Sequence, residues 1–293
     1  MMATLRALVE AARPRQWVKN GVVFAGLVFG EKLREPHAAL IALGAFAIFC
    51  ALSSSTYLFN DLCDAERDRQ HPLKRNRPIA SGRISPAVAL AVASVFVMAG
   101  LAASVLVGRP FFLLATCYVL LGLFYSRWLK DVPILDVFAV AAGFVIRAAA
   151  GAEVVNVAVS PWLLVCTMLL SLFLTLSKRR HELVLMTDQA VAHRAALSHY
   201  TPYLLDQMIS VVTASTVVCY CLYTLWPETV EKFHHTHNLV YTVPFVLFGI
   251  YRYLYLVHRA EQGDQPDKVL LTDIPMLVDV ALWLAAVVLI IYL

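Results

Sequence analysis

Charged residues are scarce in this sequence. Asp, Glu, Lys and Arg make up 15% of its 293 residues, whereas 60% are hydrophobic. A soluble globular domain carries about 25% charged residues, so the composition excludes an ordinary soluble domain and indicates a polytopic membrane protein. The sequence also lacks a low-complexity linker and the cleavage-site pattern of a signal peptide, and we expect neither. Its six cysteines show no metal-binding spacing and are interpreted as small hydrophobic residues.

Long apolar segments account for the hydrophobic excess. A spanning helix needs about 20 mostly apolar residues, and about nine segments approach this length. They are residues 18–32, 37–60, 86–107, 110–127, 133–151, 161–177, 204–225, 239–257 and 273–292. The first is the weakest, because Gly21, Gly26 and Gly30 interrupt it. Pro86, Pro133 and Pro161 are typical of first helical turns. We therefore predict an all-α fold of about nine transmembrane helices.

The distribution of Lys and Arg predicts the orientation in the membrane. Nearly all of them lie in the N-terminal segment or in alternate loops, including the long polar connections 61–85, 178–203 and 258–272. The exceptions are Lys32, Arg34, Arg109 and Lys232 on the opposite side and Arg147 inside a span. Because cytoplasmic loops carry the excess of basic residues, we expect the N-terminus and these connections in the cytoplasm and the protein in the plasma (inner) membrane.

The strongest chemical signal is a group of oxygen-bearing side chains where the second span leaves the membrane. The group consists of Asn60, Asp61, Asp64 and Asp68. Helical spacing predicts that the first, third and fourth of these share one face, with Asp61 beside them. Such hard oxygen ligands suit Mg²⁺, which commonly carries substrate phosphates. The basic residues Lys74, Arg75 and Arg77 follow directly and would bind the same phosphates. The pattern suggests a site for a diphosphate.

Two further polar stretches have alternative interpretations. Arg13, Gln16, Lys19 and Asn20 surround Trp17, either as an interfacial anchor or as substrate contacts. Polar side chains at the start of a span are costly without partners, which favours the second interpretation.

The other stretch contains Lys178, Arg179 and Glu182, and it is either a positive-inside stop or a basic loop that holds a phosphate. Glu182 would pair with a neighbouring base or help to hold metal. His181 is interpreted as a polar loop residue.

Arg147 lies inside the fifth apolar segment, so we expect it to face an interior cavity or a partner rather than lipid. Asp136 is about three helical turns away, which is too far for a direct pair, so each side chain should have another contact. Tyr57 is included among the substrate-binding candidates, although tyrosines in apolar segments are packing residues by default.

The pattern Asn-Asp-x-x-Asp-x-x-x-Asp at 60–68, at the end of the second span, resembles the UbiA-type superfamily of intramembrane prenyltransferases. The resemblance implies one transmembrane domain over residues 1–293, with a central cavity open to the cytoplasmic face. It also implies an isoprenyl diphosphate held through Mg²⁺ by two Asp-rich motifs, the second after the sixth span. The stretch 178–183, which begins with three basic residues, stands in place of that second motif.

Three features together are similar to the polyprenyl-phosphate (decaprenyl-phosphate) phosphoribosyltransferase branch of this superfamily. They are the stretches 13–20, 60–79 and 178–183. The resemblance implies an enzyme that transfers a phosphoribosyl group from phosphoribosyl pyrophosphate (PRPP) to a polyprenyl phosphate with Mg²⁺. More phosphate groups need more fixed cations, which agrees with a basic stretch replacing an acidic one.

The resemblance assigns roles to the candidates. Asn60, Asp61, Asp64 and Asp68 become metal ligands and catalytic residues, and the basic candidates bind substrate. Two alternatives stay open, namely a prenyltransferase that joins an isoprenyl diphosphate to a small aromatic acceptor, and a lipid-phosphate transporter. No nucleic acid is expected as a partner. The oligomeric state is left open, a homo-oligomer included.

Overall fold

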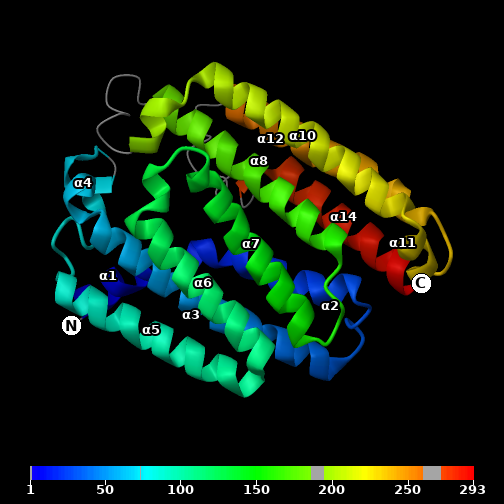
Figure 1. The fold of residues 1–293 in the computed structure, drawn as a ribbon, viewed down its shortest axis with the longest axis horizontal. Coiled ribbons are helices and arrows are strands. Elements are labelled where there is room, and N and C mark those ends of the chain that lie inside the picture. Colours follow the sequence, from blue (N-terminus) through cyan, green and yellow to red (C-terminus); the bar gives the residue numbers. More distant parts are fainter. Residues whose placement is uncertain (1, 73, 186–194, 260–271) are drawn as a thin grey trace. The chain divides into compact units, whose positions relative to one another are not determined.

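The computed structural model describes residues 2–72, 74–185, 195–259 and 272–293. This part of the chain is almost entirely helical and contains no strand, which confirms the predicted all-α class (Figure 1). Parts of the polar connections 178–203 and 258–272, with Arg194 and Lys268, lie outside the described residues. The chain divides into two compact units, one formed by residues up to Ala158 together with a short helix at 195–199, and one by the remaining residues from Val159 on.

The first unit contains most of the polar residues that the sequence singles out. Its α-helices (α) and 3₁₀-helices (η) are α1 (Met2–Ala12), η1 (Pro14–Phe24), α2 (Ala25–Phe29), α3 (Pro36–Cys63), α4 (Ala65–Gln70), η2 (Lys74–Asn76), α5 (Pro86–Val107), α6 (Arg109–Arg127), η3 (Leu129–Asp131), α7 (Leu135–Val154) and η4 (Ala195–His199). The long helix α3 packs against α5, α6 and η1. Phe49 lies at the centre of this core, edge-on to the rings of Phe111 and Tyr118.

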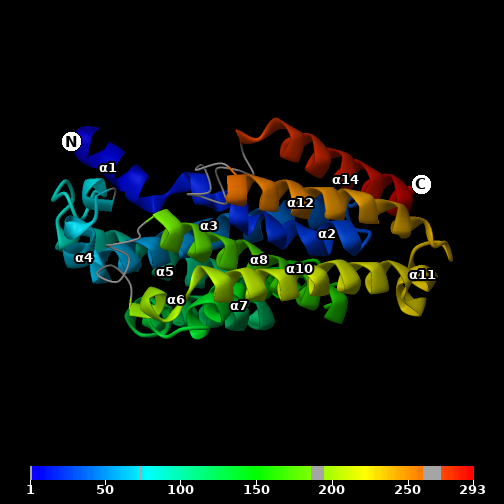
Figure 2. The same cartoon turned by 90° about the horizontal axis from the view of Figure 1, so that it is seen from above.

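The second unit consists of two packed helix pairs. Its elements are α8 (Pro161–Leu185), α10 (Pro202–Leu225), α11 (Pro227–Lys232), η5 (Asn238–Thr242), α12 (Val243–Arg259) and α14 (Ile274–Tyr292). Helix α8 packs along α10, and α12 packs along α14 (Figure 2). A buried hydrogen bond between the Tyr220 hydroxyl and Thr242 ties α10 to η5, and the Trp283 indole of α14 donates to the same hydroxyl.

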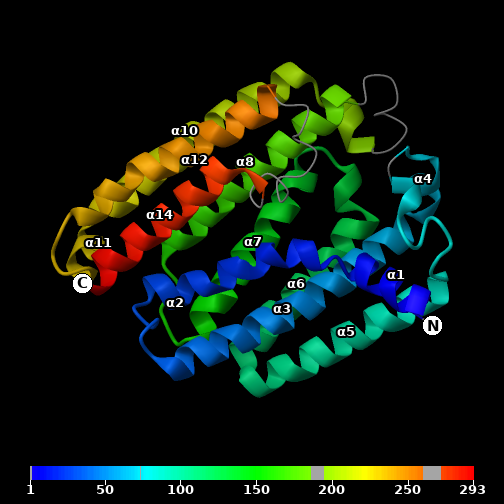
Figure 3. The same ribbon diagram turned by 180° about the vertical axis from the view of Figure 1, so that it is seen from behind.

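Eight helices in the described part are long and apolar enough to span a membrane. They correspond to eight of the nine predicted segments. The segment 18–32 is the exception, because it folds as the end of η1, the five-residue α2 and a turn. The prediction of a continuous helix is therefore wrong there. With rises of roughly 2.0 and 1.5 Å per residue, η1 and α2 together extend about 30 Å, and Figure 3 shows this stretch running alongside α3.

Two other sequence predictions are corrected at helix ends. Helices α5 and α8 begin at Pro86 and Pro161 as predicted, with the Ser85 hydroxyl accepting from the Val88 amide. Pro133, however, precedes α7, since Ile134 has a left-handed φ of 69° and the helix starts at Leu135. The predicted basic loop at 178–183 is also wrong, because α8 continues through it to Leu185.

Candidate functional site

The acidic motif lies where α3 ends and α4 begins. Asp64 is both the C-cap of α3 and the N-cap of α4. Its backbone angles, φ −97° and ψ 0°, interrupt the helix within the motif. Asp61 and Asp68 are buried, with 2% and 4% of their surface exposed. A carboxylate in such a position needs charged or hydrogen-bonding partners, because an isolated buried charge is strongly unfavourable.

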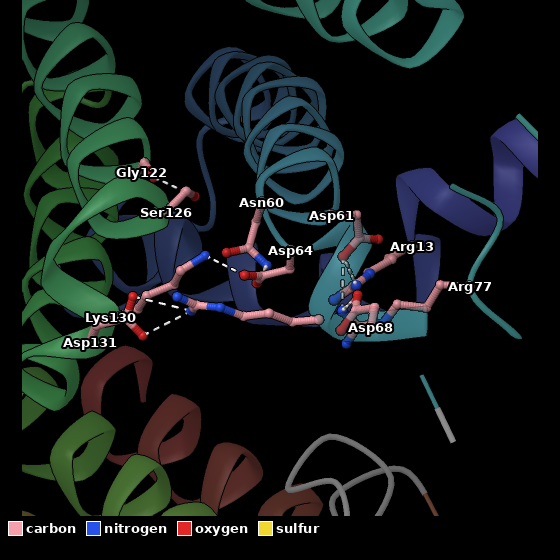
Figure 4. A network of polar contacts seen from close by, with 11 residues as sticks. Arg13, Asn60, Asp61, Asp64, Asp68, Arg77, Gly122, Ser126, Lys130 and Asp131 are labelled. Carbon is pink, nitrogen blue, oxygen red and sulfur yellow. Dashed lines mark hydrogen bonds and ion pairs between the residues drawn. The ribbon is translucent and has the colours of Figure 1, made fainter. Parts of the chain in front are cut away.

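Two arginines satisfy the buried pair of aspartates. Arg13 Nη2 lies 2.6 Å from Asp61 Oδ1. Arg77 Nη1 bridges the pair, at 3.0 Å from Asp61 Oδ1 and 2.7 Å from Asp68 Oδ2. Arg13 comes from the start of η1 and Arg77 from the connection between α4 and α5. The contacts of these two arginines therefore hold the start of η1 and the α4–α5 connection against the two carboxylates of the motif (Figure 4).

The other half of the motif has a different partner. Asn60 Nδ2 donates to Asp64 Oδ2 at 3.2 Å. Lys130 of η3 places its ammonium nitrogen 2.5 Å from Asp64 Oδ1, and the Lys130 side chain is almost fully buried. Asn60 Oδ1 is buried and has no hydrogen-bond partner among the described residues. An orphaned buried oxygen beside a carboxylate is a feature that a bound cation would satisfy.

The four predicted ligands thus form two pairs rather than one face. Asn60 and Asp64 face Lys130, whereas Asp61 and Asp68 face Arg13 and Arg77 (Figure 4). The interruption at Asp64 and the Arg77 bridge account for the division. Three cations meet three carboxylates, so the motif neutralises itself. In the described part of the chain, no three His, Cys, Asp or Glu side chains converge as a metal site by themselves.

Burial also affects the protonation of the motif. Desolvation raises the pKa of Asp68 above its ordinary value, and the Arg77 guanidinium offsets only part of this effect. Nearby, Arg83 forms a two-point ion pair with Glu10 of α1 at 2.7 and 2.9 Å, and this contact lowers the pKa of Glu10. The pair ties α1 to the connection that carries Arg77.

The residues of η1 have three different environments. Arg13 lies on Asp61 and over the Tyr57 ring, 5.2 Å from its centroid, so Tyr57 also borders the motif. Gln16 and Lys19 are half-buried. Asn20 is fully buried, and its amide nitrogen donates to Ser53 Oγ at 3.1 Å. The amide of Asn20 is therefore committed to protein contacts, which differs from the substrate contact suggested by the sequence.

Arg147 has the alternative contacts expected for it. Its Nη1 donates to Tyr118 OH at 3.0 Å and, more weakly, to Asn20 Oδ1 at 3.4 Å. The guanidinium also lies over the Phe144 ring, 4.3 Å from its centroid. Ion pairs within the described residues do not include Arg147, whose Nε is buried without an acceptor.

The remaining predicted substrate residues lie in two places. Lys74 is half-buried in η2, and Arg75 beside it is exposed. In the second unit, Lys178 and Arg179 occupy the last turns of α8, and Arg179 Nη1 pairs with Glu182 Oε2 at 2.8 Å, as expected for a neighbouring base. His181, predicted to be a polar loop residue, is instead buried in this helix.

Sequence reasoning missed Lys130. In the sequence it is one basic residue among those of the alternate loops, yet in the structure it is the direct partner of Asp64. The neighbouring Asp131 was missed too, and it accepts from Arg67 Nη1 at 3.1 and 3.2 Å. The available signal was a Lys-Asp pair in the short connection between the segments 110–127 and 133–151.

Comparison with known proteins identifies the family. Residues 21–274 match the UbiA prenyltransferase family. The chain belongs to this family. It is accordingly a multi-pass membrane protein.

Two relatives match over nearly their whole length. A decaprenyl-phosphate phosphoribosyltransferase of Mycolicibacterium smegmatis is 32% identical over 276 residues, which covers 91% of this chain and 86% of the relative. The Corynebacterium glutamicum protein of the same name is 32% identical over 291 residues, covering 97% and 86%.

Among solved structures, a UbiA homologue from Archaeoglobus fulgidus bound to GPP and Mg²⁺ has the same fold. It superposes with a TM-score of 0.73 and covers 98% of this chain and 100% of that one, at 19% identity. At this identity the likeness concerns the fold alone. It confirms the UbiA-type architecture implied by the sequence resemblance.

Proposed function

We propose that this UbiA family member transfers the 5-phosphoribosyl group from PRPP to a polyprenyl phosphate of the decaprenyl type and releases pyrophosphate. The observation that carries the proposal is the 32% identity, over most of both chains, to relatives named decaprenyl-phosphate phosphoribosyltransferase. Their names agree with the predicted enzyme class, a glycosyltransferase that transfers a pentosyl group. The basic end of α8, with Lys178 and Arg179, adds support, because it stands where the resemblance led us to expect a second acidic motif.

The proposed magnesium site is the acidic motif. Mg²⁺ is usually held by one or two carboxylates together with substrate phosphates, so a complete protein cage is not needed. Asn60 Oδ1 and Asp64 offer adjacent oxygens, and Asp61 and Asp68 offer a second set. These oxygen donors fit Mg²⁺, and a relative of the same fold is bound to it with GPP. When bound, the metal would stabilise negative charge on the pyrophosphate group.

The side chains that now neutralise the motif are suited to bind the donor. An incoming diphosphate would compete with the carboxylates for Arg13, Arg77 and Lys130. Arg forms two parallel hydrogen bonds to phosphate oxygens, whereas Lys supplies a point charge. We assign Arg13, Gln16 and Lys19 to the pyrophosphate because the first of them lies on Asp61. On the sequence resemblance, we assign Lys178 and Arg179 to a substrate phosphate.

The reaction requires no general base. A lipid phosphate oxygen, already anionic at neutral pH, supplies the electron pair for a new bond to C1 of the ribose. The bond between C1 and the pyrophosphate oxygen breaks, and pyrophosphate leaves with that electron pair. Catalysis then consists mainly of positioning the two anions and stabilising the leaving group.

The setting in the membrane follows from the same proposal. We place the N-terminus and the acidic motif in the cytoplasm, from which soluble PRPP would enter, and the lipid tail between helices. We treat residues 1–293 as one functional domain because the family match runs across both compact units. The central cavity implied by the resemblance stays a prediction.

The test is a two-donor transfer assay with purified protein in nanodiscs. One arm supplies radiolabelled PRPP and polyprenyl phosphate with Mg²⁺, and the other supplies labelled isoprenyl diphosphate and a small aromatic acid. We expect label to enter the lipid phase only in the first arm, and EDTA to abolish the transfer until Mg²⁺ is restored. Label transfer in the second arm alone would establish the prenyltransferase alternative, which agrees with the name of the UbiA prenyltransferase family.

A further inference from the structure

Helix η1 separates its residues into three stripes. In a 3₁₀-helix, residues three apart eclipse one another, because there are three residues per turn. Gln16 and Lys19 form one stripe and are half-buried. Arg13, also half-buried, precedes η1 as its cap residue and has left-handed backbone angles, φ 53° and ψ 61°. A second stripe contains Trp17, Asn20 and Val23, of which the latter two are fully buried. Arg15 and Val18 of the third stripe are exposed.

The buried stripe attaches η1 to the rest of the first unit. The Trp17 indole donates to Ser54 Oγ at 3.0 Å, and this hydroxyl lies within hydrogen-bond distance of the Ala12 and Cys50 carbonyls. Three residues on, the Asn20 amide donates to Ser53 Oγ. At Val23, the backbone carbonyl lies so close to Gly151 of α7 that no Cβ would fit there. Since 3₁₀-helices longer than three or four residues are uncommon, these contacts account for an eleven-residue one.

Arg147 completes the attachment at Asn20. A charged side chain inside a span is costly and normally has a functional partner. Arg147 is 5% exposed and lacks a carboxylate partner among the described residues, but it donates to Asn20 Oδ1 and Tyr118 OH. Asn20 thus donates to α3 and accepts from α7 through a single side chain.

We infer that Asn20 and Arg147 are positioning residues that keep η1 in its three-residue repeat. This repeat aligns Gln16 with Lys19 along one edge of η1, and Arg13, the residue that precedes η1, lies on the acidic motif. The kinetic test of this inference rests on the proposed function, because it uses PRPP as substrate. The alignment of the η1 side chains does not depend on that function. In an α-helix, by contrast, residues three apart are rotated by about 60° around the axis, so Lys19 would lie off the line through Gln16.

A double-mutant cycle tests whether Arg147 acts through Asn20. We expect Asn20→Ala and Arg147→Met each to raise the KM for PRPP, lowering kcat/KM on the order of 10²-fold, since small misplacements of binding groups have effects of this size. The double variant should lose little more than either single variant. A loss equal to the product of the two would show that Arg147 acts on its own and would overturn the inference. Partial misfolding would instead lower kcat at unchanged KM.

Two basic residues of η1, Lys19 on the half-buried stripe and Arg15 on the exposed stripe, provide a test of the alignment. Lys19→Ala should raise the KM for PRPP at least tenfold, whereas Arg15→Ala, on the exposed stripe, should leave it within twofold. An equal change of the KM for PRPP in both variants would contradict the inference that the three-residue repeat places Lys19, but not Arg15, towards the substrate.

Cysteine labelling separates this inference from the proposed function. Single cysteines would replace residues 15–19 in a Cys63→Ala, Cys117→Ala background and be treated with a maleimide. Fast reaction at positions 15 and 18 and slow reaction at 17 is expected, with loss of this pattern when Asn20→Ala or Arg147→Met is added. If the pattern holds and is lost in this way but PRPP is no substrate, only the proposed function fails. An unchanged pattern in both variants would refute the positioning role.

Discussion

Lys130 places its ammonium nitrogen 2.5 Å from Asp64 Oδ1, although 66 residues separate the two in sequence. The contact joins the interruption between α3 and α4 to the connection between α6 and α7. Lys130 is 4% exposed, so its charge has little access to water, and Asp64 is its partner. If Asp64 held a metal ion, the Lys130 ammonium group beside it would be free to bind a phosphate oxygen of the proposed substrate.

Removing this charge should impair the proposed transfer. Hydrogen bonds to charged groups contribute about 1.5–3 kcal/mol, so Lys130→Met should lower kcat/KM for PRPP roughly 10- to 100-fold. Steady-state kinetics in nanodiscs would measure it. Arg127→Ala is the matched control, since that basic residue is exposed at the end of α6, next to the same connection, and should have little effect. Equal losses in both variants would mean that the net charge of the connection matters rather than the contact with Asp64.

Asp64 should be indispensable for turnover. Asp64→Ala removes one of the proposed metal ligands, and we expect activity to fall at least about 10³-fold while the protein keeps its elution profile and helicity. Glu66→Ala, an exposed carboxylate two residues away, should retain near-normal activity. Near-normal turnover of Asp64→Ala would rule out the proposed magnesium site.

Gly151 should be essential for the fold of the first unit. A Cβ at this position would meet the Val23 carbonyl oxygen, and a Cβ added at Gly26 of α2 would lie 2.6 Å from the backbone of Ala152. We expect Gly151→Ala to destabilise the protein by about 1–3 kcal/mol through overpacking. Denaturant titration in micelles would measure this, with Gly44→Ala as control, because a Cβ at Gly44 meets no atom within 4 Å. Equal stability of the two variants would contradict the close contact between η1 and α7.

Asp273 should make stability depend on pH. It caps α14 by accepting from the Met276 amide, and Arg252 donates to both of its oxygens. The Arg252 hydrogen bonds lower the pKa of Asp273 below its ordinary value near 3.8. A lowered folded-state pKa means that this stabilisation is present above the ordinary value and is lost as pH falls through the lowered one.

At pH 7, Asp273→Ala should therefore reduce the free energy of unfolding by about 1 kcal/mol, the usual size of a lost cap. The difference from the unsubstituted protein should shrink as acid protonates Asp273. Denaturant titrations at several pH values would follow it. A difference that grows in acid would reverse the assigned sign.

Helix positions were largely predictable from the sequence, because a membrane imposes about 20 apolar residues on each span. Helix α5, for example, has the predicted bounds 86–107. The prediction of a continuous helix over residues 18–32 was wrong, because the 3₁₀ conformation there depends on contacts with α3 and α7, notably at Asn20 and Gly151. Hydropathy carries no information about such contacts.

For the site, the sequence located the acidic motif but not its pairing. Spacing on an ideal helix cannot anticipate the break at Asp64 or the bridge that Arg77 makes between Asp61 and Asp68. The contact of Lys130 with the motif could not be predicted, because its partner Asp64 is distant in sequence. Charge pattern alone likewise assigned residues 178–183 to a loop, whereas the Arg179–Glu182 pair lies within α8.

The most direct test of phosphoribosyl transfer uses PRPP with ¹⁸O in the bond between C1 and the pyrophosphate. The protein, Mg²⁺ and polyprenyl phosphate are incubated with it, and the lipid and released pyrophosphate are analysed by mass spectrometry. We predict a lipid heavier by one phosphoribosyl group without ¹⁸O, and pyrophosphate that carries the ¹⁸O. An unmodified lipid, or ¹⁸O retained on ribose phosphate because the attack occurred at phosphorus, would contradict the proposed function.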